Sequence, residues 1–122
     1  MKTTRFAVAG LLAVAVVTCT PAFAHAFLEH ASPAVGSTVH ESPASVRLSF
    51  SEPLEPAFTR AHVEDATGKV VDAGDAHVDA ADRTIVAVAV PPLPAGTYRV
   101  RWRVVSIDTH VTEGDYTFTI AK

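Results

Sequence analysis

Residues 97–106 read TYRVRWRVVS, and apolar and polar side chains alternate along most of this stretch. Successive side chains of a β-strand point to opposite faces, whereas the apolar positions of a helix recur every 3.6 residues. The stretch is therefore predicted to be a strand with one face in the core. The apolar face carries Tyr98, Val100, Trp102 and Val104, and the other face carries Arg99, Arg101 and Arg103.

Short segments with the same strand character occur on both sides of this stretch and are separated by turn residues. They are Val46–Phe50, Ala61–Glu64, Lys69–Asp72, Thr84–Val90 and Tyr116–Ile120. Residues 93–98 resemble a tyrosine corner, in which a Tyr hydroxyl holds the crossing between two sheets. This pattern predicts an all-β fold, an immunoglobulin-like antiparallel β-sandwich of about seven strands. We expect its core to contain Phe50, Tyr98, Val100, Trp102 and Phe118.

The first 24 residues have the features of a secretory signal peptide in their usual order. Lys2 and Arg5 precede the uninterrupted apolar run Phe6–Val17. Residues 22–24 read Ala-Phe-Ala and place small side chains at the two positions that a signal peptidase reads. The apolar run is shorter than the roughly 20 residues that span a membrane.

We therefore predict a signal peptide over residues 1–24 and an exported domain over residues 25–122. The location would be periplasmic, or extracytoplasmic in a host without an outer membrane. While the leader is attached, Phe6–Val17 is expected to form a helix that packs on little. Lipoprotein processing at Cys19 and an uncleaved anchor are the alternatives.

Charge and sulfur content exclude several classes of function. Residues 25–122 contain 8 basic and 13 acidic side chains, a formal charge of −5. Nucleic acid is therefore an unsuitable partner, because a domain that tracks phosphates needs a basic face. The only methionine and the only cysteine, Met1 and Cys19, both precede residue 25. The exported domain thus lacks disulfides, thiol chemistry and any thiolate or thioether metal site.

Two histidine-containing features favour a metal site. If cleavage follows Ala24, His25 becomes the first residue, and its α-amine and imidazole Nδ1 can close one chelate ring. Asp108 and His110 follow the clearest strand, and residues i and i+2 of an extended segment point the same way. Three nitrogens and one oxygen suit tetragonal Cu(II), with Zn²⁺ as the weaker candidate. Taken alone, Asp108 and His110 are also typical of a hairpin end with an Asx-type turn.

Other polar groups have simpler interpretations. The acidic residues of segment 72–82 are interpreted as a solvated loop and strand edge rather than a calcium loop. The arginine row is interpreted as an exposed face that balances these acids, with an anion or partner site as the alternative. Ser106, Asp108 and His110 are the residue types of a hydrolytic triad, but an extended strand would separate each pair by about 7 Å. A hydrolase is therefore not predicted. The histidines expected to be exposed are His30, His40, His62 and His77.

Several short motifs follow His25 in order. They are Ser32-Pro33-Ala34-Val35-Gly36-Ser37, Val46-x-Leu48-x-Phe50-Ser51-Glu52-Pro53, Leu93-x-x-Gly96-x-Tyr98-x-Val100-x-Trp102, Val105-Ser106-x-Asp108-x-His110 and Gly114-x-Tyr116-x-Phe118. Each motif is weak alone, but the ordered set resembles the periplasmic copper-resistance proteins of the CopC type. The resemblance extends through essentially the whole of residues 25–122.

The resemblance implies a β-sandwich that binds one Cu(II) through His25, Asp108 and His110. It places Glu52 beside the ion, as a hydrogen-bond partner of the ligands or a weak axial ligand. It also implies a CopD-type inner-membrane copper importer as a partner, and we expect a monomer. Many members carry a Met-rich loop that binds Cu(I), so the missing methionines predict a Cu(II)-only protein. Val111 stands where members often have Pro, which affects the local turn but no ligand.

The sequence thus predicts an exported, soluble protein that sequesters or carries Cu(II) in copper resistance or homeostasis, and not an enzyme. One alternative is a copper oxidoreductase resembling the lytic polysaccharide monooxygenases, which also hold copper with an N-terminal His and a second His. Those enzymes are generally much longer, and Asp108 would occupy an equatorial position that oxygen chemistry needs open. A structural sandwich without metal is the other alternative, if His25 is not the terminus.

Overall fold

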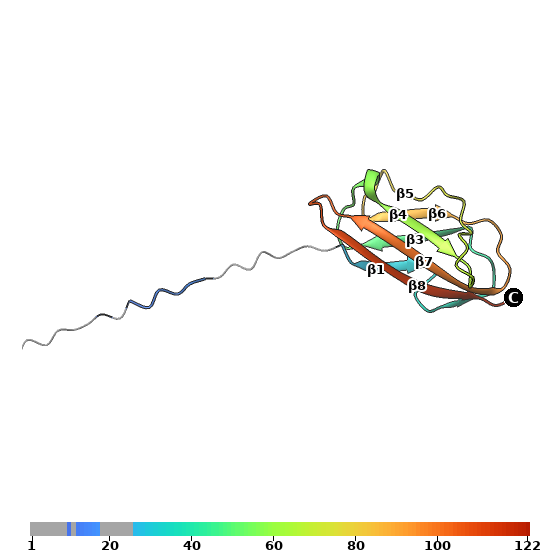
Figure 1. The fold of residues 1–122 in the computed structure, drawn as a ribbon, viewed down its shortest axis with the longest axis horizontal. Coiled ribbons are helices and arrows are strands. Elements are labelled where there is room, and N and C mark those ends of the chain that lie inside the picture. The colour runs from blue at the N-terminus through green and yellow to red at the C-terminus, as the bar shows by residue number, and fades with distance from the viewer. Residues whose placement is uncertain (1–9, 11, 18–25) are drawn as a thin grey trace, which may run out of the picture.

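Two four-stranded sheets pack face to face in the computed structural model, which describes Gly10, residues 12–17 and residues 26–122 (Figure 1). The all-β sandwich is therefore confirmed, and the described residues form eight strands rather than about seven. One sheet has the order β1-β3-β6-β5 and contains β1 (Leu28–Ser32), β3 (Ser45–Phe50), β6 (Ile85–Ala89) and β5 (His77–Val78). The other has the order β2-β8-β7-β4 and contains β2 (Thr38–Val39), β8 (Val111–Ile120), β7 (Gly96–Val105) and β4 (Arg60–Glu64).

The β7–β8 hairpin is the long element that positions the candidate site. The two strands pair antiparallel from Gly96 opposite Ile120 to Val105 opposite Val111. β8 begins five residues before the predicted start at Tyr116, because polar side chains at its exposed positions obscure the alternation. The chain enters the sandwich at the end that also holds the tip of this hairpin and the 3-10 helix η1 (Pro56–Phe58) (Figure 1).

The strand predicted over Lys69–Asp72 is wrong. This segment makes only an isolated bridge between Val70 and Glu64, at the edge of β4. The backbone N–H of Val63 donates to the Asp72 carboxylate at 2.8 Å. The Asp72 carboxylate thus accepts the hydrogen bond that a backbone carbonyl would accept in a continuous strand ladder, and the strand pairing with β4 ends at this residue. The short strands β1, β2 and β5 were not predicted, because two to five residues at a sheet edge give little alternation to read.

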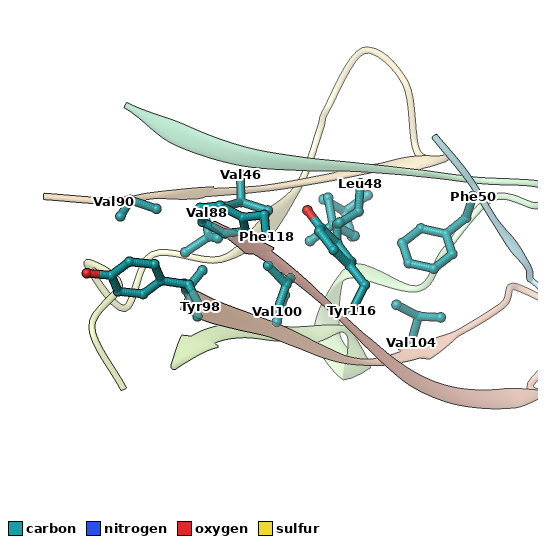
Figure 2. Close-up of a cluster of buried hydrophobic side chains, with 14 of the residues drawn as sticks. Val46, Leu48, Phe50, Val88, Val90, Tyr98, Val100, Val104, Tyr116 and Phe118 are labelled. Atoms are coloured by element: carbon teal, nitrogen blue, oxygen red, sulfur yellow. The ribbon is translucent and has the colours of Figure 1, made fainter. Parts of the chain in front are cut away.

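The core lies between the inner faces of the two sheets (Figure 2). β3 contributes the alternate residues Val46, Leu48 and Phe50, and β7 and β8 contribute aromatic and aliphatic side chains from the other sheet. Of the five expected core residues, Phe50, Tyr98, Val100 and Phe118 are buried. Period-two alternation therefore identified the inner face correctly on both sheets.

Trp102, the fifth expected core residue, is only partly buried. Its ring meets Phe50 edge-on at a centroid distance of 6.0 Å and lies 6.2 Å from the Tyr116 ring. Its register partner on β8 is Gly114, where an added Cβ would collide with the indole. The missing side chain at Gly114 therefore makes the space that the Trp102 ring occupies.

The tyrosine corner is present. The Tyr98 hydroxyl donates to the backbone carbonyl of Pro94 at 2.7 Å, four residues upstream. Burial raises the pKa of the Tyr98 phenol, which therefore remains a neutral donor at physiological pH. A second buried phenol, that of Tyr116, donates to the Pro33 carbonyl at 2.8 Å. These two bonds fix the connections that enter the sheets.

The apolar run near the start of the chain is helical in the prediction but not in the part that the structure describes. Leu12–Val17 have no regular secondary structure, and their side chains are exposed. An apolar helix of about 12 residues is marginal when no surface packs against it, which accounts for the difference. Gly10 is likewise irregular and exposed, and residues 6–9 and 11 lie outside the described residues. In the described part of the chain, no helix is long and apolar enough to cross a membrane.

Candidate metal centre

The tip of the β7–β8 hairpin brings together two of the predicted metal ligands. His110 Nδ1 lies 3.2 Å from Asp108 Oδ2. The segment is a tight turn, not the extended strand that was expected, because Ser106 N–H donates to the His110 carbonyl at 3.0 Å. Thr109 closes the turn at φ 71°, a backbone region that a β-branched residue rarely adopts. The side chains converge as predicted, but through the turn.

Ser106 holds the Asp108 carboxylate from the protein side. Its hydroxyl donates to Asp108 Oδ1, and the Ser106 residue is almost completely buried. This hydrogen bond, together with the neighbouring His110, lowers the pKa of Asp108 below its ordinary value. The carboxylate is thus ionised at neutral pH, and about half of the Asp108 side chain and a third of the His110 side chain remain exposed. An anionic oxygen and an imidazole accordingly face solvent side by side.

The prediction that Ser106, Asp108 and His110 would be out of hydrogen-bond range is wrong, because the turn shortens the distances. The direction of the hydrogen bond between Ser106 and Asp108 still does not suit a hydrolase. The serine hydroxyl donates to the carboxylate, whereas an activated nucleophile needs its proton directed at a base such as the imidazole. The hairpin end is confirmed, but the His110 N–H that would close an Asx turn on the Asp108 carboxylate donates to Ser106 Oγ instead, at 3.3 Å.

A second segment, residues 51–55, joins this hairpin to the beginning of the domain. On one side, Phe27 N–H donates to Ser51 Oγ, and Ser51 N–H donates to the Phe27 carbonyl, both at 2.8 Å. On the other side, Leu54 bridges to Ser106, and Ile107 N–H donates to the Pro53 carbonyl at 3.2 Å. These bonds place the start of β1 and the hairpin tip on opposite flanks of one connecting segment.

Glu52 lies within that connecting segment and is partly buried. Its two chain neighbours make the contacts to Phe27 and Ile107, so the backbone around it is fixed. Ala26, the first residue of the domain that the structure describes, is completely buried. His25 lies outside the described residues. Within those residues, no group of three or more His, Cys, Asp or Glu side chains is arranged to hold a metal ion.

The other histidines are exposed, as expected, and lie away from the hairpin tip in sequence. His40 Nδ1 is 2.9 Å from the Ala121 carbonyl, and His77 Nδ1 is 2.9 Å from the Asp75 carbonyl. Sequence reasoning gave Ser106 and Ser51 no supporting role. The signals for Ser106 were its place two residues before the candidate ligand Asp108 and its presence in the motif that ends at His110.

The acidic segment 72–82 consists of turns around the short edge strand β5, in agreement with its interpretation as a loop and strand edge. Both oxygens of Asp72 accept backbone N–H groups, at 2.8 Å each. Asp79 accepts the N–H groups of Ala81 and Asp82, and Asp82 in turn accepts the N–H and hydroxyl of Thr84. These carboxylates serve the local backbone, which explains why they cluster.

Comparison with known proteins identifies the family of the domain. The sequence model of the CopC domain matches residues 28–121. This chain belongs to the CopC family. Protein YobA of Escherichia coli K12 is 33% identical over 120 residues, which cover 98% of this CopC-family chain and 95% of YobA.

Solved CopC structures have the same fold. The crystal structure of CopC from Methylosinus trichosporium OB3b superposes with a TM-score of 0.74 at 38% identity, covering 79% of this chain and 93% of that chain. PcoC, a methionine-rich copper resistance protein from Escherichia coli, gives a TM-score of 0.71 at 38% identity and is covered completely. The similarity spans 80% of this CopC-family chain in the PcoC case.

Proposed function

We propose that this CopC-family protein binds copper as its cargo, as one Cu(II) per chain, and serves copper resistance or homeostasis. The observation that carries the proposal is the 3.2 Å approach of His110 to an ionised Asp108 at an exposed hairpin tip. The similarity to a protein described as a copper resistance protein supports copper as the metal. The ligands would be the amine and imidazole of His25, the Asp108 carboxylate and the His110 imidazole.

The position of Ala26 supports His25 as the third ligand residue. Ala26 is buried, and Phe27 is held by two hydrogen bonds to Ser51 at the hairpin end of the sandwich. Consecutive Cα atoms are 3.8 Å apart, so a chain cleaved after Ala24 would begin at this same end. Glu52, in the segment between the two flanks, would lie beside the ion.

The chemistry of the donors favours Cu(II) over Cu(I). Residues 25–122 contain no sulfur, and the proposed set has three nitrogens and one oxygen. Cu(I) prefers soft thiolate or thioether ligands, whereas imidazole, amine and carboxylate groups in a tetragonal arrangement suit Cu(II). The low pKa of Asp108 supplies the anionic ligand without a proton to displace.

The protein would be a carrier rather than a catalyst. The Asp108 and His110 side chains are partly exposed at a hairpin tip, which lets an ion enter and leave. In a copper oxidoreductase, an equatorial carboxylate would take the position that oxygen chemistry needs. We further propose that residues 1–24 are a removed signal peptide and that the monomeric domain works in the periplasm.

A CopD-type membrane importer is the proposed copper acceptor. Three large apolar side chains are more than half exposed on the elements around the hairpin tip: Phe27, Phe58 and Ile107. Phe58 belongs to η1, and Ile107 belongs to the hairpin tip itself. An acceptor that takes the ion must cover this end, and it would bury these side chains.

Metal titration tests the function. The protein beginning at His25 is expected to bind one Cu(II) tightly, with a tetragonal, nitrogen-rich electron paramagnetic resonance spectrum, and to hold Cu(I) poorly. Competition with Cu(II) and Cu(I) chelators measures both affinities. A preference for Cu(I), or no tight copper binding, would overturn the ligand set. Copper-dependent peroxide production on a polysaccharide would favour the oxidoreductase alternative.

The pH dependence of copper affinity is expected to have two parts. Between about pH 8 and pH 5 the affinity should fall, because imidazoles and α-amines ordinarily take up protons in this range and metal must then displace them. Asp108 should add to the fall only at pH values below the ordinary range of an aspartate pKa, since its own pKa is lowered in the folded protein. Ser106→Ala removes the hydrogen bond that is the main cause of the lowered Asp108 pKa, and the Asp108-dependent loss of copper affinity should then begin at higher pH. Chelator competition at each pH measures both, and a steep change from Asp108 near neutrality would contradict the assignment.

A further inference from the structure

A groove of about 480 Å³ lies on the outer face of the β2-β8-β7-β4 sheet, apart from the proposed copper ligands. Its walls come from β4, β7 and β8, and the chain's only tryptophan, Trp102, contributes to its lining. The side chains that matter for its chemistry are Arg60, His62, Arg101, Arg103 and Glu113. The copper site does not use any of them.

Basic side chains face one another across β4 and β7 in this groove. Arg60 is the register partner of Arg103, and His62 is the register partner of Arg101. Like charges directly opposite each other in a sheet are destabilising. The strands therefore concentrate positive charge on one face of a chain whose formal net charge is −3.

Each of the three arginines of β7 forms an ion pair with one acidic side chain on a neighbouring strand. Arg101 Nε pairs with Glu64 at 3.1 Å, Arg103 Nε pairs with Glu113 at 3.2 Å, and Arg99 pairs with an oxygen of Asp115 at 3.1 Å. The acids of segment 72–82 were expected to balance this row, and that expectation is wrong for the arginines. Of that segment, Asp72 contacts only His62 in this groove, at 3.4 Å.

Arg60 is the arginine of the groove that these acids do not pair with. The ion pairs of residues 26–122 include none for Arg60. A guanidinium has five N–H donors, and Arg103 uses its Nε toward Glu113, so both opposed side chains keep donors for another acceptor. Paired guanidinium groups are well suited to hold one carboxylate through charge-assisted hydrogen bonds.

We propose that this groove binds an acidic peptide segment of a partner protein, with a carboxylate side chain held between Arg60 and Arg103. The negative flank of the groove supports a peptide over an anionic membrane. Glu113 and Asp115 would repel a continuous layer of lipid phosphates, whereas a peptide can place a neutral or basic residue beside them. Arg60 is the exposed first residue of β4, which leaves its side of the groove accessible to a peptide.

The test uses metal-free protein, so its result does not depend on copper binding. The probe is an acetylated and amidated peptide, Ser-Asp-Ser-Asp-Ser, and the uncharged control replaces both Asp residues with Asn. Binding is followed by Trp102 fluorescence and by calorimetry. We expect saturable binding of the Asp peptide that weakens with salt. Arg60→Gln should weaken it about tenfold, the scale of a lost charge-assisted hydrogen bond.

Arg47→Gln is the matched control, because Arg47 is an exposed arginine on β3 of the opposite sheet. It should bind the Asp peptide as the parent does. The thermal midpoint of Arg60→Gln should equal or exceed that of the parent, since no ion pair is lost and one repulsion is relieved. Equal binding of the Asp and Asn peptides, or equal affinity of Arg60→Gln and parent, would overturn the proposal. So would Arg60-dependent binding to phosphatidylglycerol vesicles without binding to the peptide.

Discussion

Replacing His110 with alanine is expected to lower the Cu(II) affinity of the protein by more than 100-fold. Its imidazole lies 3.2 Å from the Asp108 carboxylate and is a third exposed, so it is placed to coordinate an ion at the hairpin tip. Loss of a group that only supports a ligand typically costs 10- to 100-fold, and loss of a ligand itself should cost more. Competition with a Cu(II) chelator at neutral pH, on the protein beginning at His25, measures the change.

Other histidines provide controls for this variant. His62→Ala and His77→Ala remove exposed imidazoles that contact Asp72 and the Asp75 carbonyl, and they should change the Cu(II) affinity little. Glu52→Ala is expected to lie between, with a 10- to 100-fold loss, if Glu52 supports the ligands. Urea unfolding without copper should give all four variants stabilities near that of the parent, because these side chains are exposed or partly exposed. An equal loss for His110→Ala and His77→Ala would indicate general surface binding rather than a site.

The fold could be predicted because alternation is a local property that the sequence displays directly. The inner residues of β3 and β7 are apolar at every second position, and the structure buries nearly all of them. Lys69–Asp72 also contains two apolar residues, Val70 and Val71, but the Asp72 carboxylate accepts the Val63 N–H and ends the pairing. That outcome depends on a hydrogen bond between segments, which no local pattern reports.

The site was harder to predict than the fold, because its geometry depends on a turn without a turn signature. Hairpin turns with positive φ usually place Gly, Asn or Asp at that position, whereas here it is Thr109. The spacing of Asp108 and His110 was therefore interpreted as extended, and the contact from Ser106 to Asp108 was missed. The proximity of the Asp108 and His110 side chains was nonetheless predicted correctly, since both a strand and this turn bring residues i and i+2 together.

The N-terminal extension Gly-Ser in front of His25 is expected to lower the Cu(II) affinity by more than 100-fold without changing any side chain of the domain. In the cleaved protein, the α-amine of His25 offers a nitrogen lone pair next to the imidazole. In the extended protein, that nitrogen becomes a planar amide with a proton, and its lone pair is delocalised into the carbonyl. The chelate ring opens, and two imidazoles and the Asp108 carboxylate remain. Both proteins are made by specific proteolysis of one precursor, and competition with a Cu(II) chelator compares their Cu(II) affinities.

The extension separates a metal effect from a folding effect. Ala26 keeps its burial and Phe27 keeps its hydrogen bonds to Ser51 in both proteins, so urea unfolding without copper should coincide. With copper present, the cleaved protein should gain stability according to its affinity, and the extended protein should gain correspondingly less. Matched unfolding without metal, together with equal Cu(II) affinity, would mean that His25 is not a chelating terminus. Asp108 and His110 would then have to bind the ion with other donors, and the Cu(II)-carrier proposal would lose its main physical support.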